Sequence, residues 1–204
     1  MLKNFLHSCK IEAGCDEAGR GSLCGPVCAA AVILPADYFN PLLNDSKKMT
    51  VKSRNLLRTE IEGIAIDYAV AFVDNQTIDK INILKASIMA MHLALDKLKV
   101  RPEHILVDGN RFYPYNGIES TCIIKGDGIY APIAAASVLA KTYRDELMFK
   151  LHDEFNQYGW DRNKGYPTIF HKQAIADYGT TIYHRLTFNL INRQTEISFD
   201  SVTK

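Results

Sequence analysis

Residues 12–34 read EAGCDEAGRGSLCGPVCAAAVIL, and this stretch decides the fold. Its first part, Glu12 to Asp16, is partly apolar and runs toward glycines, which predicts a strand that enters a turn. Its last part, Pro26 to Leu34, is a continuous run of small and β-branched residues closed by Pro35, which predicts a partner strand. The sequence therefore places acidic residues where the first of two neighbouring strands ends.

The rest of the chain alternates between helix and strand patterns. Helical patterns cover residues 50–61, 81–98 and 133–155, and a further helix is expected after Pro167. Strand patterns cover residues 64–73, 104–108 and 121–125. This order predicts an α/β fold in which helices cover a mixed sheet.

The composition is that of one ordinary globular domain, residues 1–204, with a polar and frayed tail over about 192–204. Lys plus Arg is 24 and Asp plus Glu is 23, so the net charge of +1 excludes a uniformly basic coat, and a polyanionic partner must meet a local patch. No apolar run approaches the roughly 18 residues of a membrane span, and no secretory signal is evident. The cysteines lack CxxC spacing and the six histidines lack metal spacing, which predicts reduced thiols in a cytoplasmic protein.

Acidic residues fall where predicted strands end. Asp16 and Glu17 end the first strand, Asp108 ends the strand at 104–108, and Asp127 lies in a glycine-flanked loop before the long helix. If these ends gather at one edge of the sheet, repulsion raises some carboxyl pKa values or requires a cation. Ligands that are all oxygen favour Mg²⁺ or Mn²⁺ over zinc. Two such ions about 3.5–4 Å apart activate a water and stabilise the leaving oxygen of a phosphodiester.

Other interpretations of these residues stay open at this point. Each acid also suits a turn or a helix N-cap, where Asp is common. Adjacent strand residues point to opposite faces, so Asp16 and Glu17 share one site only if the chain turns at the following glycines. A dinucleotide-binding GxGxxG motif is rejected, because Cys24 stands where that motif requires its third glycine.

A series of short motifs along the chain resembles ribonuclease HII, the type 2 ribonuclease H. In order, the motifs are GCDEAGRG at 14–21, GP at 25–26, DSKK at 45–48, VDG at 107–109, KGD at 125–127, AASVLAK at 135–141, RD at 144–145, GYPT at 165–168 and HR at 184–185. They span nearly the whole chain. Cys15 and Thr168 are departures, since an apolar residue and a serine are common at these places.

The resemblance implies an RNase H-like fold, with a mixed five-stranded sheet flanked by helices and a helical C-terminal part. It implies that Asp16, Glu17, Asp108 and Asp127 are the catalytic carboxylates and hold two divalent ions, Mg²⁺ or Mn²⁺. The implied reaction hydrolyses the phosphodiester on the 5′ side of a ribonucleotide, in RNA/DNA hybrids and at single ribonucleotides embedded in duplex DNA. It leaves 3′-hydroxyl and 5′-phosphate ends and initiates ribonucleotide removal from DNA.

The resemblance also implies which residues bind the substrate. The backbone of Gly19, Arg20 and Gly21 grips the 2′-hydroxyl, and Tyr166 adds a hydroxyl contact and stacks on the neighbouring deoxyribose. Such a site rejects deoxyribose because its polar groups would stay unpaired. Residues expected to contact phosphate are Ser46 and Lys47, with Lys141, Lys164, Lys172 and Arg185 as further candidates. Residues expected to be structural are Asp145, Tyr158, Trp160 and His184.

Two alternatives accompany this interpretation. A type 3 ribonuclease H shares the fold and similar carboxylates but usually has an extra N-terminal domain, and a catalytically idle protein would bind hybrids without cutting them. The presence of all four carboxylates favours an enzyme. The expected partners are RNA/DNA hybrid and ribonucleotide-containing duplex DNA, with no membrane, and the expected state is a monomer. The tail from Gln194 to Phe199 weakly resembles a sliding-clamp-binding peptide.

Overall fold

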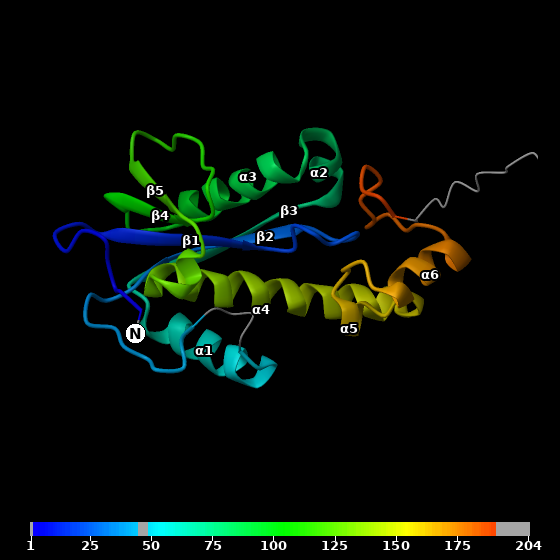
Figure 1. Ribbon diagram of the computed structural model, residues 1–204, viewed down its shortest axis with the longest axis horizontal. Helices are drawn as coiled ribbons and strands as arrows, with labels where there is room; N and C mark the ends of the chain where they lie inside the picture. The colour runs from blue at the N-terminus through cyan, green and yellow to red at the C-terminus, as the bar shows by residue number, and fades with distance from the viewer. Residues whose placement is uncertain (1, 45–48, 191–204) are drawn as a thin grey trace, which may run out of the picture.

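A five-stranded sheet forms the centre of the computed structural model, which describes residues 2–44 and 49–190 (Figure 1). The strands lie in the order β3-β2-β1-β4-β5. Their bounds are β1 Glu12–Ala18, β2 Val27–Ile33, β3 Asp67–Val73, β4 His104–Asp108 and β5 Glu119–Ile123. The first three strands pair antiparallel, whereas β1 pairs with β4, and β4 with β5, in parallel. The mixed sheet expected from the sequence is confirmed.

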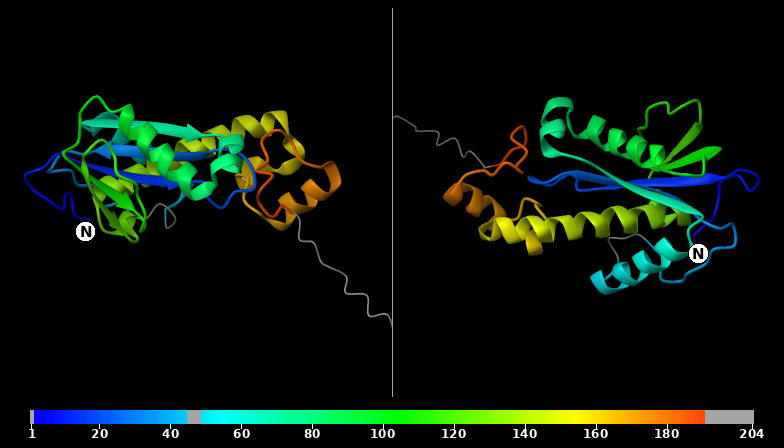
Figure 2. Two further views of the ribbon diagram at one scale, coloured as in Figure 1. Left: turned by 90° about the horizontal axis from the view of Figure 1, so that it is seen from above. Right: turned by 180° about the vertical axis from the view of Figure 1, so that it is seen from behind.

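Helices cover both faces of this sheet (Figure 2). Their bounds are α1 Val51–Ile64, α2 Asn75–Ile81, α3 Ile83–Asp96, α4 Ala131–Glu154, α5 Trp160–Asn163 and α6 Ile169–Tyr178, with short 3-10 turns η1 at Gly126–Gly128 and η2 at Asn156–Tyr158. Helix α3 lies on one face, α4 lies on the other with α1 outside it, and α5 and α6 gather beyond one end of the sheet (Figure 1). None of the helices in this described part of the chain has the length and hydrophobicity of a membrane span.

Alternation along β2 shows why both faces are covered. Its odd-numbered residues, from Val27 to Ile33, belong to the apolar cluster with α3, and its even-numbered residues belong to the cluster with α4. Small side chains let α4 lie directly on the sheet. At Gly14 in β1 an added Cβ would come within 2.2 Å of the Pro132 carbonyl carbon, so only glycine permits this contact.

The structure corrects several predicted boundaries. The helix expected over residues 81–98 is α3, which covers Ile83–Asp96. It begins after Asn82, because Asn82 has a positive φ of 69° and its side chain accepts hydrogen bonds from the first N–H groups of α3. Helix α1 continues to Ile64, so β3 begins at Asp67, and β5 begins at Glu119, before the predicted start at residue 121. The short helices α2 and α5 were not predicted.

The region beyond α4 has a small core of its own, formed by aromatic and histidine side chains. The rings of Tyr158 and Trp160 are stacked 5.1 Å apart, and Trp160 Nε1 donates a hydrogen bond to His171 Nε2 at 3.0 Å. These three residues and His184 are all buried. The structural roles expected for Tyr158, Trp160 and His184 agree with this packing. The tail predicted over about 192–204 lies outside the described residues.

Candidate active site

The carboxyl ends of β1 and β4 bring predicted acidic residues together. Parallel pairing places Cys15 opposite Val107, so the next residues, Asp16 and Asp108, lie side by side, with Asp108 at the end of β4 and Asp16 two residues before the end of β1. They line a cavity of about 230 Å³. The residues lining it are Asp16, Glu17, Ala18, Gly19, Arg20, Gly21, Asp108, Ser137, Lys141 and Tyr166. Seven of the ten residues predicted from the sequence to be catalytic or to bind the substrate through the loop at 19–21, Tyr166, Ser46 or Lys47 therefore lie around one cavity.

Asp16 and Glu17 reach this cavity from different faces of β1. The neighbours of Asp16 at alternate positions, Gly14 and Ala18, face α4, while Cys15 packs in the cluster with α3. Glu17 therefore starts from the α3 side, and it lines a second, smaller cavity there together with Asp108. Adjacent strand residues are expected to point to opposite faces and so to miss a common site. Asp16 and Glu17 nevertheless line the same cavity, because Glu17 lies near the end of the strand and its side chain borders both cavities.

Burial and like charge dominate the electrostatics of the site. The pKa of Asp16 is raised well above its usual value by burial and then by the nearby carboxylates of Glu17 and Asp108, although a hydrogen bond with Ser137 acts in the opposite direction. The two cations that line the cavity are each paired with a carboxylate, one of them within the cavity. Arg20 is ion-paired with Glu17 at 3.1 Å, and Lys141 is ion-paired with Asp145 at 2.6 Å.

The fourth predicted carboxylate, Asp127, lies in η1 between β5 and α4. The preceding residue, Gly126, donates its backbone N–H to Asp108 Oδ1 at 2.7 Å, which joins this turn to the end of β4. The Asp127 side chain is buried, and it is not among the residues that line the cavity. The structure therefore brings three of the four predicted carboxylates to one cavity wall and holds the turn that carries the fourth against Asp108.

This donor set fits a hard divalent cation. Asp16, Glu17 and Asp108 offer only carboxylate oxygens, and no histidine or cysteine lines the cavity. Oxygen donors of this kind bind Mg²⁺ and Mn²⁺ and do not favour zinc. The pKa of Asp16 is raised first by burial and then by the neighbouring carboxylates, and a bound cation would offset both effects.

A buried arginine fixes the glycine-rich loop that follows β1. Arg185 is fully buried, and it donates hydrogen bonds to the carbonyls of Gly19 (2.8 Å), Arg20 (3.0 Å) and Gly25 (3.0 Å). These carbonyls are therefore occupied. Within the residues that the structure describes, no hydrogen bond uses the N–H of Arg20 or Gly21. The loop consequently keeps two backbone donors available beside the cavity that it lines.

A second buried arginine joins this loop region to the segment that carries Tyr166. Arg144 in α4 donates to the carbonyls of Cys24 (3.2 Å), Pro26 (3.0 Å) and Lys164 (2.9 Å). It also lies so close to Gly19, which has a φ of +92°, that an added Cβ there would come within 2.0 Å of the Arg144 Nε. The Tyr166 ring lies near Gly21, 3.9 Å from the place where a Cβ would be. One α4 side chain thus sets the spacing between the two loops.

Some predicted phosphate contacts do not agree with this geometry. Arg185 is wholly committed to backbone carbonyls, so its proposed phosphate contact is wrong. Lys164 donates to the Asp161 carbonyl and lies over the Phe149 ring. Ser46 and Lys47 lie outside the described residues. The sequence analysis missed Ser137 and Arg144 as parts of the site, because both occur within an otherwise ordinary helix and only their motif context marked them.

The sequence of the chain matches one protein family over most of its length. The family model described as Ribonuclease HII matches residues 13–191. A curated protein named Ribonuclease HII from Bacteroides thetaiotaomicron is 60% identical over 191 residues, which are 94% of this chain and 96% of that protein. Another of that name, from Christiangramia forsetii, is 59% identical over 198 residues, which are 97% of this chain and 100% of that protein.

Solved structures agree in fold. The ribonuclease H2 of Pyrococcus horikoshii OT3 superposes with a TM-score of 0.73 at 26% identity, covering 88% of this chain and 94% of that one. The ribonuclease HII of Archaeoglobus fulgidus, solved in a complex with PCNA, gives a TM-score of 0.73 at 26% identity over 87% and 95%. Bst ribonuclease HIII, solved with Mn²⁺, gives 0.73 at 19% identity over 91% and 68%, a likeness of fold alone.

Proposed function

The chain belongs to the ribonuclease HII family of endoribonucleases, and on this premise we propose that it cuts the phosphodiester on the 5′ side of a ribonucleotide. The proposed substrates are RNA/DNA hybrids and single ribonucleotides embedded in duplex DNA, and the products carry 3′-hydroxyl and 5′-phosphate ends. This reaction would initiate ribonucleotide removal from DNA. The observation that supports the proposal most is the cavity whose walls combine Asp16, Glu17 and Asp108 with the loop at 19–21.

We assign Asp16, Glu17, Asp108 and Asp127 as the residues that would hold two divalent cations, Mg²⁺ or Mn²⁺. Such cations, when bound, supply Lewis-acid stabilisation of the phosphate oxygens and a water of lowered pKa. The contribution of the chain would be to keep Asp16, Glu17 and Asp108 at the carboxyl ends of two paired strands, with Asp127 in the turn that is joined to Asp108, so that the scissile phosphate is oriented. Ser137 holds Asp16 by a hydrogen bond, which favours its ionised form.

Recognition of the ribose is assigned to the loop of Gly19, Arg20 and Gly21 and to Tyr166. The 2′-hydroxyl is the only chemical difference between ribose and deoxyribose at the target, and it both donates and accepts hydrogen bonds. The N–H groups of Arg20 and Gly21 are suited to donate to it, because the carbonyls of Gly19 and Arg20 are already occupied by Arg185. The Tyr166 ring beside Gly21 would stack on the neighbouring sugar. A deoxynucleotide would leave these donors unpaired, and this penalty is the source of the selectivity.

Further parts of the proposal concern the chain as a whole. We propose one catalytic domain, and the family match over residues 13–191 supports this. We propose a monomer, and we propose phosphate contacts from Ser46 and Lys47. A cytoplasmic location is supported by the five free cysteines. For the tail from Gln194 to Phe199 we propose contact with a sliding clamp, and the PCNA complex of the Archaeoglobus fulgidus relative supports this.

The test uses an end-labelled DNA duplex that carries one ribonucleotide, beside an all-DNA duplex of the same sequence and an RNA/DNA hybrid. Each is incubated with Mg²⁺, with Mn²⁺ or with chelator. We expect cutting only 5′ to the ribonucleotide, only with a divalent ion, and none by Asp108→Asn. Asp145→Asn is the matched control, because this neighbouring carboxylate is ion-paired with Lys141. Cutting of the long hybrid alone would support type 3 behaviour and overturn the proposed substrate.

A further inference from the structure

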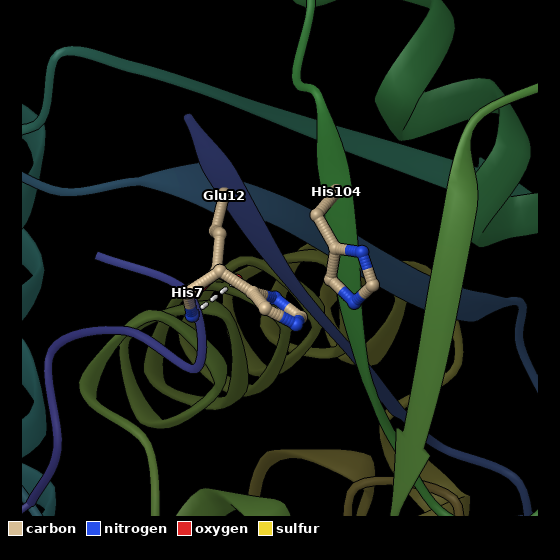
Figure 3. Close-up of side chains that lie close together, drawn as sticks. All are labelled: His7, Glu12 and His104. Atoms are coloured by element: carbon tan, nitrogen blue, oxygen red, sulfur yellow. Dashed lines mark hydrogen bonds and ion pairs between the residues drawn. The ribbon is translucent and has the colours of Figure 1, made fainter. Parts of the chain in front are cut away.

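A second cluster of ionisable side chains lies at the opposite end of the same two strands from the proposed active site (Figure 3). Glu12 begins β1 and His104 begins β4, and the parallel register places these two residues opposite each other. Each lies four residues before a carboxylate of the active site, Asp16 or Asp108, which is about 13 Å along a strand. His7, in the segment before β1, completes the cluster.

Within the described part of the chain, the hydrogen bonds of the cluster use every ring nitrogen and carboxylate oxygen of its three residues except Nδ1 of His104 and Nε2 of His7. Glu12 accepts from the backbone N–H groups of Leu6 (2.7 Å) and His7 (2.9 Å), and its Oε1 lies 2.9 Å from His7 Nδ1. His104 Nε2 lies 2.9 Å from Thr121 Oγ1. His104 is completely buried, yet its Nδ1 has no hydrogen-bond partner among the described residues. The nearest acidic oxygen to that atom is Glu119 Oε2, at 3.7 Å.

A buried imidazole nitrogen without a partner is unusual, because buried polar atoms are nearly always satisfied by protein, water or an ion. When the Nε2–H of His104 donates to Thr121 Oγ1, the Nδ1 atom of His104 carries a lone pair. Histidine ligands in metal sites have this arrangement, in which the second ring nitrogen is held by a carboxylate or a hydroxyl. His7 Nδ1 and Glu12 Oε1 now share a hydrogen bond, and both atoms would be available to an ion once that bond is released.

We propose that His7, Glu12 and His104 form a binding site for a first-row transition metal ion, with zinc as the ion that fits best. Two imidazoles and one carboxylate are a common zinc ligand set, with a water or a further oxygen as fourth ligand. The nitrogen donors give this site a different metal preference from the all-oxygen site at the other end of the strands, which favours Mg²⁺ or Mn²⁺.

The distances allow this coordination after a small adjustment. One ligand atom from each of the three residues lies within 4.8 Å of the others, whereas donors around a tetrahedral zinc ion are about 3.4 Å apart. Glu12 and His104 are held in the sheet, with the Glu12 side chain 2% exposed, so His7, with its side chain 39% exposed, must supply most of the movement. Its position before β1 also gives the ion a route from solvent. A bound ion would tie the N-terminal segment to β1 and β4.

Zinc binding by the metal-free full-length chain tests the proposal. The chain should carry Cys9→Ser and Cys122→Ser, because these two cysteines are exposed and thiolates bind zinc. Zinc uptake is measured by equilibrium dialysis and the melting temperature by calorimetry. The visible spectrum with Co²⁺ as the probe reports four-coordinate nitrogen ligation, which absorbs far more strongly than a six-coordinate oxygen site. Variants His7→Gln and His104→Gln remove ligands, Asp108→Asn weakens the carboxylate site, and His152→Gln is the matched histidine control.

We expect one zinc ion to be lost in His7→Gln and in His104→Gln and to be retained in Asp108→Asn and in His152→Gln. Zinc should raise the melting temperature of the parent and of His152→Gln, and the rise should disappear in both ligand variants. His7 is partly exposed, so His7→Gln remains informative even if His104→Gln fails to fold. Equal zinc uptake and an unchanged Co²⁺ spectrum in His7→Gln would overturn the proposal, as would the absence of zinc uptake by the parent at micromolar concentration.

Discussion

The replacement Arg185→Lys tests whether the buried guanidinium holds the ribose-binding loop. Arg185 donates three hydrogen bonds, to the carbonyls of Gly19, Arg20 and Gly25, at 2.8–3.0 Å. Lysine keeps the positive charge but has a single ammonium group, which cannot span three carbonyls in the way that a planar fork of donors does. The substitution therefore changes hydrogen-bonding geometry more than charge.

The expected magnitude follows from the number of carbonyls that lose their donor. An ammonium group reaches one or two of the three, so one or two carbonyls are left unsatisfied, and each costs about 1–3 kcal/mol. We expect the free energy of unfolding to fall by about 3 kcal/mol, which corresponds to about 6–12 °C in melting temperature for a chain of this length. The loop at 19–21 should also lose its fixed orientation in the molecules that remain folded.

Urea-induced unfolding, followed by circular dichroism, measures the first effect. The second is measured as kcat and KM on the single-ribonucleotide duplex, at least 20 °C below the melting temperature of the variant. We expect kcat/KM to fall roughly 10- to 100-fold under these conditions, about 1.4–2.7 kcal/mol of transition-state stabilisation. Arg101→Lys is the control, because Arg101 is exposed and donates a single bond to the Asn116 carbonyl, so stability should change by less than about 0.5 kcal/mol.

Two results would refute this reasoning about Arg185. Stability within about 0.5 kcal/mol of the parent would mean that the three hydrogen bonds contribute little. A loss of stability with unchanged kcat/KM would mean that the loop keeps its orientation without the guanidinium, and that ribose recognition depends on other groups.

Three further predictions concern ionisable residues. Asp16→Asn should abolish cleavage yet raise the melting temperature measured by calorimetry at pH 7.5 without divalent ions, because the raised pKa of Asp16 makes its ionised form unfavourable in the fold, and this gain should shrink as the pH falls toward 4 and vanish below about pH 3, where the carboxyl is protonated in the unfolded state as well. Asp127→Asn should reduce kcat/KM on the single-ribonucleotide duplex by at least 100-fold, whereas Asp145→Asn should retain measurable activity, and equal losses would contradict this ranking. Burial, followed by the neighbouring His171, lowers the pKa of His184 to about 4, so the native state resists protonation. The free energy of unfolding should therefore fall by roughly 2–4 kcal/mol as the pH falls from 6.5 toward 4. Urea unfolding of the parent and of His184→Asn at pH 7 and pH 5 checks this, and an equal pH dependence in both proteins would exclude His184 as the cause of the loss.

The parts of the fold that could be predicted from sequence are those with a local cause. The strand at residues 12–16, the glycine-rich turn after it and the strand at 26–34 each carry their own periodicity and turn residues. Asn82 could not be placed in the same way, because the apolar pattern continues through it into α3, and only its positive φ and its cap hydrogen bonds end one helix and begin the next. The helix predicted over 81–98 is therefore present as α3, and its predicted start was wrong.

The candidate site also contains residues that could be predicted from the sequence and residues that could not. Asp16 and Asp108 could be predicted to meet, because parallel strands carry their C-terminal ends to one edge of a sheet. The role of Arg185 could not be predicted, because arginine is rarely buried fully and nothing local indicates which carbonyls it binds. The same holds for His7 and His104, which are far apart in the sequence and meet only through the register of β1 with β4.

The pairing of β1 with β4 also has a consequence for the order in which the molecule folds. Strands β1, β2 and β3 are close in sequence, whereas 85 residues separate Ala18 from His104. Closing that long segment is entropically unfavourable and slow compared with forming the neighbouring antiparallel strands. Asp16 and Asp108 therefore come within repulsive range of each other only after β4 has docked. We therefore expect the carboxylate cluster to form late in folding, and a chain interrupted before β4 would carry Asp16 and Glu17 without Asp108 and Asp127.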